Sequence, residues 1–162
     1  MSMIPWSVNE EDYAVPKRTG KQACDLGAVA ELEFLTQAKR RGWNVYVPIG
    51  HATPADAIIF RPPARPISVQ VKKGMSRGSG RGWKAMVGSG LSKRAIKHSL
   101  HFSKFRRYES NSFDVMAMYI AEENLFIFWT LAELLQRGKT WAIWTTIKPS
   151  NNWEIFDRFE AA

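Results

Sequence analysis

The 162-residue sequence predicts an α/β protein. An amphipathic helical pattern comes first, short apolar runs separated by Gly- and Pro-containing turns follow it, and a second, shorter helical pattern interrupts those runs near the end. A chain of this length fits one domain, which would bury roughly two thirds of the surface that the unfolded chain exposes.

The chain divides into three parts. Residues 1–24 combine prolines with an acidic run and show no periodicity, so we expect an arm. Residues 25–147 contain all the predicted helices and strands and would form the domain. Residues 148–162, which include Trp153, Ile155 and Phe156, would pack against that domain as a tail.

The first predicted helix begins at Asp25, whose carboxylate suits an N-cap, and ends at Gly42. Cations lie in its last turn, where they interact favourably with the helix dipole: Lys39, Arg40 and Arg41.

Two glutamates of this helix are predicted to have different surroundings. At about 100° per residue, Glu31 lies on the apolar stripe and Glu33 on the solvated face. The stripe neighbours of Glu31 are Ala28, Leu35 and Ala38, and Glu33 shares its face with Gln37 and Arg40. A carboxylate on an apolar stripe is costly unless a partner meets it, so Glu31 is either a site residue or half of a buried ion pair, for example with Lys72.

A strand at residues 43–48 follows the helix, and a turn leads into a hairpin of two strands, 55–60 and 67–72. The connection between them contains prolines, which cannot donate hydrogen bonds to a sheet. Because side chains alternate along a strand, pairing Asp56 with Gln70 or Lys72 would place all three polar groups on one face. The alternative is an edge hairpin with a cross-strand ion pair.

One segment makes the protein basic. The net charge is +8, and between Asp56 and Glu109 there are thirteen Lys and Arg and no acidic residue. Such a concentration is typical of proteins that bind a polyphosphate, so we favour nucleic acid, with a solubilising charge run or an acidic membrane surface as alternatives. The glycine-rich residues 74–82 form either a loop that approaches phosphate or a plain hairpin tip.

Beyond this loop, the sequence predicts a strand at 83–87 and a basic helix at 92–102. Two apolar strands, 113–120 and 125–130, are expected to be buried on both faces. Thr130 and Glu133 form a capping box for a short helix that ends at Gly138, and residues 141–147 form a last strand.

Cysteine and histidine usage argues against a disulfide or a structural zinc site. Cys24 is the single cysteine, and no apolar N-terminal signal or long apolar run is present, so we expect a soluble protein of a reducing cytoplasm. The histidines lack zinc-site spacing: His51, His98 and His101.

These elements, in this order, resemble the PD-(D/E)XK nuclease superfamily. The residues that carry the likeness are Glu31 in the helix, the Arg41-Gly42-Trp43 corner, Pro54 and Asp56, and the Gln70-Val71-Lys72 strand. Small single-domain prokaryotic endonucleases, of the homing-endonuclease or Holliday-junction-resolvase type, are similar over residues 25–73 and more loosely over 113–135, where Asp114 begins a strand. The resemblance implies a restriction-endonuclease-like core, with a mixed central β-sheet flanked by helices.

The resemblance also assigns four catalytic residues: Glu31, Asp56, Gln70 and Lys72. The family motif usually has Asp or Glu at the position of Gln70, so the expected metal cage loses one negative charge. Mg²⁺, or Mn²⁺ in its place, would be held by Asp56, the Val71 carbonyl, the Gln70 amide oxygen and Glu31. Lys72 would orient the attacking water and oppose the developing charge.

Resemblance and charge together predict a Mg²⁺-dependent endonuclease that acts on double-stranded or branched DNA. A homodimer or higher oligomer is expected, because one site per chain must cut two strands. The cations expected to contact the DNA backbone are Lys73, Arg77, Arg81, Lys84, Lys93, Arg94 and Lys97.

Two other functions stay open at this point. The chain could be an inactive DNA-binding module whose cage lost its carboxylate at Gln70. It could also be an RNA-binding protein that stacks bases on exposed aromatic side chains. The aromatic candidates are Trp83, Phe102, Phe105 and Tyr108.

Overall fold

A computed structural model describes residues 20–49, 53–76, 82–88, 108–137, 142–145 and 151–160. Its main sheet has five strands in the order β1-β2-β3-β6-β7. These strands are β1 (Asn44–Tyr46), β2 (Ala57–Phe60), β3 (Ile67–Lys73), β6 (Val115–Ile120) and β7 (Leu125–Thr130). β3 and β6 are parallel and the other neighbours are antiparallel, so the expected mixed sheet is confirmed.

A second, antiparallel sheet was not predicted. It consists of β4 (Met75–Ser76), β5 (Trp83–Met86) and β8 (Ala142–Thr145), in the order β4-β5-β8. Gly74 links β3 to β4, and its N–H donates to the Tyr119 carbonyl at 2.7 Å. A Cβ at position 74 would lie 2.9 Å from that oxygen, so the link between the two sheets requires glycine.

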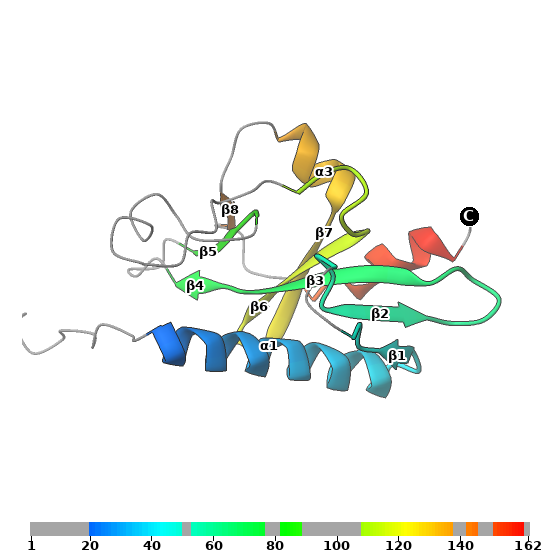
Figure 1. Cartoon of the computed structure of the whole chain (residues 1–162), viewed down its shortest axis with the longest axis horizontal. Coiled ribbons are helices and arrows are strands. Elements are labelled where there is room, and N and C mark those ends of the chain that lie inside the picture. The colour runs from blue at the N-terminus through cyan, green and yellow to red at the C-terminus, as the bar shows by residue number, and fades with distance from the viewer. Residues whose placement is uncertain are drawn as a thin grey trace, which may run out of the picture.

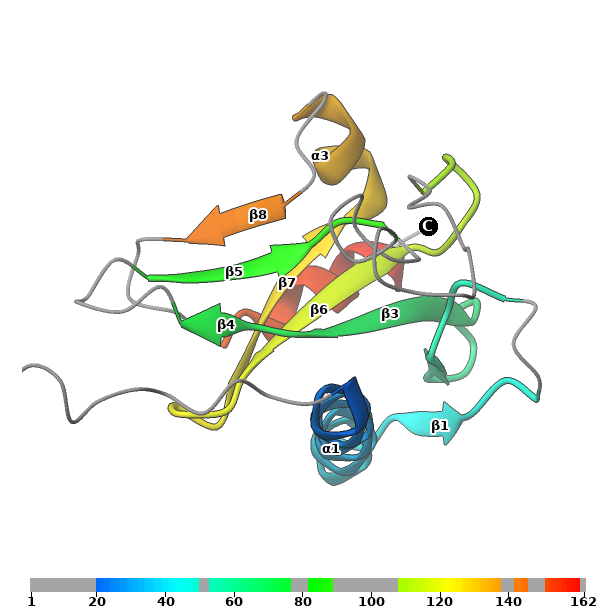
Figure 2. The same cartoon turned by 60° about the vertical axis from the view of Figure 1, so that its left-hand side comes forward.

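Two apolar cores lie on opposite faces of the main sheet, under the elements that cover each face in Figures 1 and 2. Helix α1 (Gly20–Arg40) and the 3₁₀ helix η2 (Trp153–Phe159) pack on one face, where Phe34 and Phe156 are fully buried. Strands β5 and β8 and helix α3 (Leu131–Gln136) cover the other face. The expected packing of the C-terminal residues is therefore observed, and η2 supplies part of the first core.

The end of α1 is confirmed and its start is not. The Gly42 N–H donates to Lys39 and the Trp43 N–H to Ala38, while Gly42 adopts a φ of 84°, as in a Schellman motif. The helix begins at Gly20 rather than at Asp25, which lies exposed within it. A capping side chain starts a helix only where the preceding backbone leaves the helical region, and here the preceding residues stay helical.

The buried face of α1 is displaced from the predicted stripe. Ala30, Phe34 and Ala38 are fully buried, whereas Ala28 is exposed. Glu31 lies at one border of this face.

The face predicted to be solvated is exposed at Arg40, half-exposed at Glu33 and buried at Gln37. Gln37, predicted beside Glu33 on that face, is only 6% exposed and donates to Glu33 at 3.0 Å. The same amide nitrogen lies 3.4 Å from the side-chain oxygen of Asn124, in the turn between β6 and β7. The contact with Asn124 satisfies the amide of buried Gln37. Glu33, which accepts from Gln37, lies at the border of the buried face opposite to that of Glu31.

The remaining predicted elements are found where the structure describes them. β6 is buried along its whole length, and the capping box of α3 is present, with Thr130 and Glu133 bonded to each other's backbone N–H. The predicted helix at 92–102 and the predicted helix end at Gly138 lie outside the described residues. Within the described ranges, no helix is long and apolar enough to cross a membrane.

Candidate active site

The β2–β3 hairpin brings Asp56 beside Gln70. Asp56 directly precedes β2, its N–H donates to the Val69 carbonyl at 2.9 Å, and Ala57 pairs with Val69 in the antiparallel ladder. This register selects Gln70 from the two predicted partners of Asp56. Lys72 lies two residues further along β3 and therefore shares a face with Gln70.

Gln70 joins the parts of this site. It is 5% exposed, and its amide nitrogen donates to Asp56 Oδ2 and to the Val71 carbonyl, the latter at 3.2 Å. The Val71 N–H also donates to Asp56 Oδ2, at 2.8 Å. The Gln70 amide oxygen accepts from the Tyr108 hydroxyl at 3.2 Å. A carboxylate oxygen and a main-chain carbonyl oxygen thus converge on one buried point.

Burial disfavours the charged forms of Asp56 and Lys72. It raises the pKa of Asp56, against the Val71 N–H, the Lys72 charge and the Gln70 amide. It lowers the pKa of Lys72, which the charges of Asp56 and Glu31 partly restore.

Glu31 belongs to the same electrostatic cluster. Burial and the Asp56 charge raise its pKa, and Lys72 opposes them. Glu33, in contrast, acts on Tyr119, whose pKa is raised by burial first and then by the charges of Glu33 and Glu122. The structure therefore couples Glu31, and not Glu33, to Asp56 and Lys72.

The donor set fits a hard divalent cation. Such cations prefer oxygen ligands, and Asp56 Oδ2 and the Val71 carbonyl already approach the same atom, Gln70 Nε2. A cation would also favour the ionised carboxylates that burial disfavours. In the part of the chain that the structure describes, no three His, Cys, Asp or Glu side chains gather, so the charge that Gln70 omits has no substitute there.

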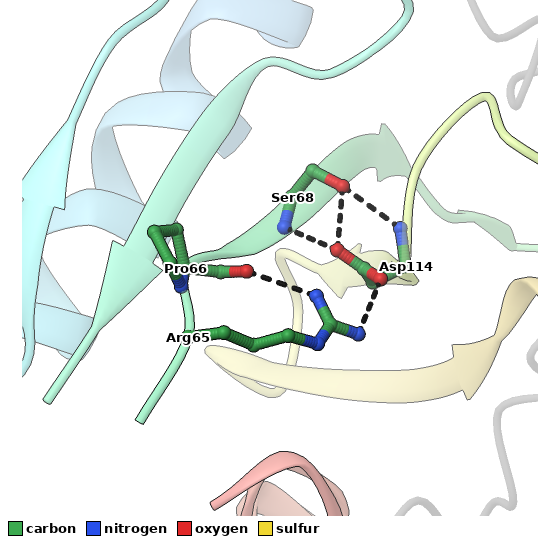
Figure 3. Close-up of polar contacts among 4 residues, drawn as sticks. All are labelled: Arg65, Pro66, Ser68 and Asp114. Atoms are coloured by element: carbon green, nitrogen blue, oxygen red, sulfur yellow. Dashed lines mark hydrogen bonds and ion pairs between the residues drawn. The ribbon is translucent and has the colours of Figure 1, made fainter. Parts of the chain in front are cut away.

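Asp114 fixes the start of β3 against β6 (Figure 3). Its carboxylate accepts from the Ser68 N–H at 2.8 Å, from the Ser68 hydroxyl at 2.7 Å and from Arg65 at 2.8 Å. Burial alone would raise the pKa of Asp114, but the bonds from Arg65 and Ser68 outweigh it and lower that pKa. Because Ser68 lies two residues before Gln70, these bonds hold the strand that carries the site in register.

The predicted DNA-contacting cations are only partly described. Lys73 is the last residue of β3, the strand that carries the site, and Lys84 lies on β5 opposite Met75 of β4. The other five lie outside the described residues: Arg77, Arg81, Lys93, Arg94 and Lys97.

Tyr108 was misjudged from the sequence. We expected an exposed aromatic, but the residue is 6% exposed, with its ring edge-on to Phe113 at 4.7 Å between centroids. Trp83 is also half-buried, against the second core. The basic residues that precede Tyr108 suggested a surface position, and no local pattern indicates a hydrogen bond to Gln70, 38 positions away in the chain.

A five-stranded mixed sheet flanked by helices is the arrangement of the restriction-endonuclease-like fold. A family model described as PD-(D/E)XK endonuclease matches residues 21–151. The chain belongs to this PD-(D/E)XK endonuclease family, as the resemblance in its sequence implied.

A solved structure supports the fold. The chain is similar to a bacterial homing endonuclease, I-Ssp6803I, with a TM-score of 0.63 and 16% sequence identity over 90% of this chain and 96% of that one. At that identity, the likeness supports the fold alone. No curated protein matches the chain.

Proposed function

We propose that this family member is a divalent-cation-dependent endonuclease that hydrolyses phosphodiester bonds in DNA. One observation carries the proposal: Asp56 Oδ2 and the Val71 carbonyl converge on a single buried point in the charge cluster of Glu31 and Lys72. Membership of an endonuclease family supports the reaction class.

Four groups would hold the cation, with Mg²⁺ as the natural ion and Mn²⁺ as a substitute. They are the Asp56 carboxylate, the Val71 carbonyl, the Gln70 amide oxygen and, directly or through water, Glu31. When bound, such an ion supplies Lewis-acid stabilisation of the phosphate and lowers the pKa of a ligated water. Because Gln70 is neutral, the charge of the site suits one cation better than two.

Lys72 would act on the reacting groups themselves. Its ammonium can donate hydrogen bonds to the attacking water and to a non-bridging phosphate oxygen, and its charge opposes the negative charge that develops on the phosphate. Burial strengthens that electrostatic effect, because the surroundings screen it less than bulk water would.

The substrate is proposed to be double-stranded or branched DNA, cut by a homodimer or higher oligomer. The acid-free basic segment supports a polyphosphate partner; Lys73 ends the strand that carries the site, and Lys84 lies on β5 opposite Met75 of β4. The structurally similar bacterial protein is a homing endonuclease, which supports DNA rather than RNA.

A cleavage assay tests the proposal. Supercoiled plasmid, a branched DNA oligonucleotide and a single-stranded RNA of matched length are incubated with the protein in Mg²⁺, in Mn²⁺ and in a chelator. We expect DNA cleavage with either ion and none with the chelator. Tight DNA binding without cleavage under any condition would favour the inactive DNA-binding module. Preferential binding of the RNA would favour the RNA-binding alternative.

A further inference from the structure

We propose that Tyr108 is a positioning residue that fixes the amide orientation of Gln70, so that the Gln70 carbonyl oxygen faces a cation held by Asp56 and Val71. This inference rests on the proposed function, because it concerns the same cation site.

Hydrogen-bond counting around the Tyr108 hydroxyl gives the first indication. The hydroxyl oxygen lies 3.2 Å from two acceptors, the Gln70 amide oxygen and the Gly88 carbonyl. A phenol has one hydrogen and can donate it to only one of them. With the amide in the observed orientation, Tyr108 therefore leaves one buried acceptor without its hydrogen.

Rotation of the Gln70 amide by about 180° resolves this conflict, because it exchanges the nitrogen and the oxygen. The Gln70 N–H then donates to the Tyr108 oxygen, and the Tyr108 hydrogen goes to the Gly88 carbonyl. The Gln70 amide oxygen now occupies the position beside Asp56 Oδ2 and the Val71 carbonyl where the nitrogen was.

The rotated orientation brings three oxygens together. Three acceptors at one point repel each other unless a cation lies between them, and three oxygens are what a hard cation prefers. The observed orientation, in which the Gln70 N–H bonds to Asp56, suits the site without an ion. The rotated orientation suits the site with one. The Tyr108 hydroxyl favours the rotated orientation, because only there can it accept from Gln70 and still donate its hydrogen to the Gly88 carbonyl.

Tyr108 is suited to hold the amide because its own position is fixed. The residue is 6% exposed and its ring packs edge-on against Phe113. A tyrosine ordinarily loses its proton only at about pH 10, so the phenol keeps the hydrogen that it must donate at neutral pH. Phenylalanine at this position would keep the ring packing and remove only the hydroxyl.

The identity of residue 70 makes the inference specific. A glutamate has two equivalent oxygens, so it needs no partner to choose which atom faces the cation. The Tyr108 hydroxyl should therefore matter with Gln70 and matter much less with a Gln70→Glu substitution. A purely structural role for Tyr108 would not depend on that substitution.

The test measures Mn²⁺ affinity without DNA, from the electron paramagnetic resonance signal of free Mn²⁺. We compare wild type, Tyr108→Phe, Gln70→Glu and the double variant. Tyr108→Phe should weaken Mn²⁺ binding about two- to tenfold, the range expected for one neutral hydrogen bond. In the Gln70→Glu background, the same change should alter affinity by less than about twofold.

A matched control is Tyr119→Phe. Tyr119 is also buried, and its hydroxyl bonds to Asn124 at 3.2 Å, away from Asp56 and Gln70. Its loss should leave Mn²⁺ affinity unchanged.

The outcomes separate this inference from the proposed function. If wild type binds Mn²⁺ and the Tyr108→Phe variant binds it equally tightly, this inference is overturned and the proposed function is not. An equal loss in both backgrounds would overturn it as well, because it would reveal only a packing role. A wild-type protein that binds no Mn²⁺ would overturn the metal-dependent function itself.

A second measurement needs no tyrosine variant. The side-chain amide signals of Gln70, assigned by their absence in Gln70→Glu, are followed by NMR during a Mg²⁺ titration of wild-type protein. We expect both amide protons to shift, because rotation takes them away from the Asp56 carboxylate and the Val71 carbonyl and brings one of them to the Tyr108 oxygen. Signals that stay unchanged while Mg²⁺ binds would overturn the inference.

Discussion

Replacement of Asp114 by alanine should destabilise the fold by about 1–4 kcal/mol, and the contacts in Figure 3 show why. The Ser68 N–H would lose its acceptor at 2.8 Å. A half-buried donor left without a partner costs about 1–3 kcal/mol. The Arg65 side chain is 51% exposed, so its ion pair with Asp114 contributes at most about 1 kcal/mol.

Urea unfolding in a chelator measures this effect. Arg65→Ala removes the ion pair together with the Arg65 bond to the Pro66 carbonyl and the contact with the Phe159 ring, and it should still cost less than Asp114→Ala because this side chain is exposed. Asp157→Ala removes an exposed carboxylate on η2 and should stay within about 0.5 kcal/mol of wild type. The reasoning would be refuted if Asp114→Ala were as stable as wild type, or if Arg65→Ala cost as much as Asp114→Ala.

The stabilisation that Asp114 provides should depend on pH in a definite direction. Because the pKa of Asp114 is lower in the folded protein, its contribution is fully present above the ordinary pKa of an aspartate and is lost as pH falls through the lowered pKa. The difference in unfolding free energy between wild type and Asp114→Ala should therefore shrink across that acidic window. A difference that grows as the pH falls would contradict the assignment.

Three further predictions concern the site and the basic segment. Glu31→Gln should impair Mn²⁺ binding or turnover, because the charges of Asp56 and Lys72 act on Glu31. Glu33→Gln should impair neither. Reversed results in a Mn²⁺ titration would refute this prediction. The Lys72 charge lowers the pKa of Asp56 and of Glu31, so Lys72→Met should raise both pKa values. Mn²⁺ binding should then be lost at a higher pH during acidification than in wild type. Loss at the same pH would argue against an effect of Lys72 on these carboxylates. A triple alanine variant of three cations around the glycine-rich loop should weaken binding to every DNA sequence and leave the cleavage position unchanged. The slope of log affinity against log salt should flatten by about 0.9 per lost phosphate contact, and a slope equal to that of wild type would remove this segment from the interface. The three cations are Arg77, Arg81 and Lys84.

Features set by a few neighbouring residues could be predicted from the sequence. The end of α1 at Gly42 follows from one residue that tolerates a left-handed backbone, and the α3 start follows from Thr130 and Glu133 three positions apart. The pairing of Asp56 with Gln70 was also within reach, because strand alternation and a proline-rich connection leave few registers.

Features that depend on distant partners could not be predicted in this way. Gln37 is buried because Asn124 meets it, and the helical pattern alone assigned Gln37 and Glu33 to solvent. Tyr108 bonds to Gln70, which lies 38 positions away in the chain. The second sheet depends on the pairing of β5 with β8, which are also far apart in the sequence. In each case the contact joins two segments that are far apart in the chain, and the sequence pattern of neither segment indicates the contact.

The most direct test of the account compares plasmid cleavage by wild type, Asp56→Ala and Asp157→Ala in Mg²⁺, with DNA affinity measured in parallel. Asp56 lies at the point where the site oxygens converge, whereas Asp157 is an exposed carboxylate on η2. We predict that Asp56→Ala binds DNA at least as tightly as wild type and does not cleave it, and that Asp157→Ala cleaves normally. Cleavage by Asp56→Ala at the wild-type rate would contradict the central claim.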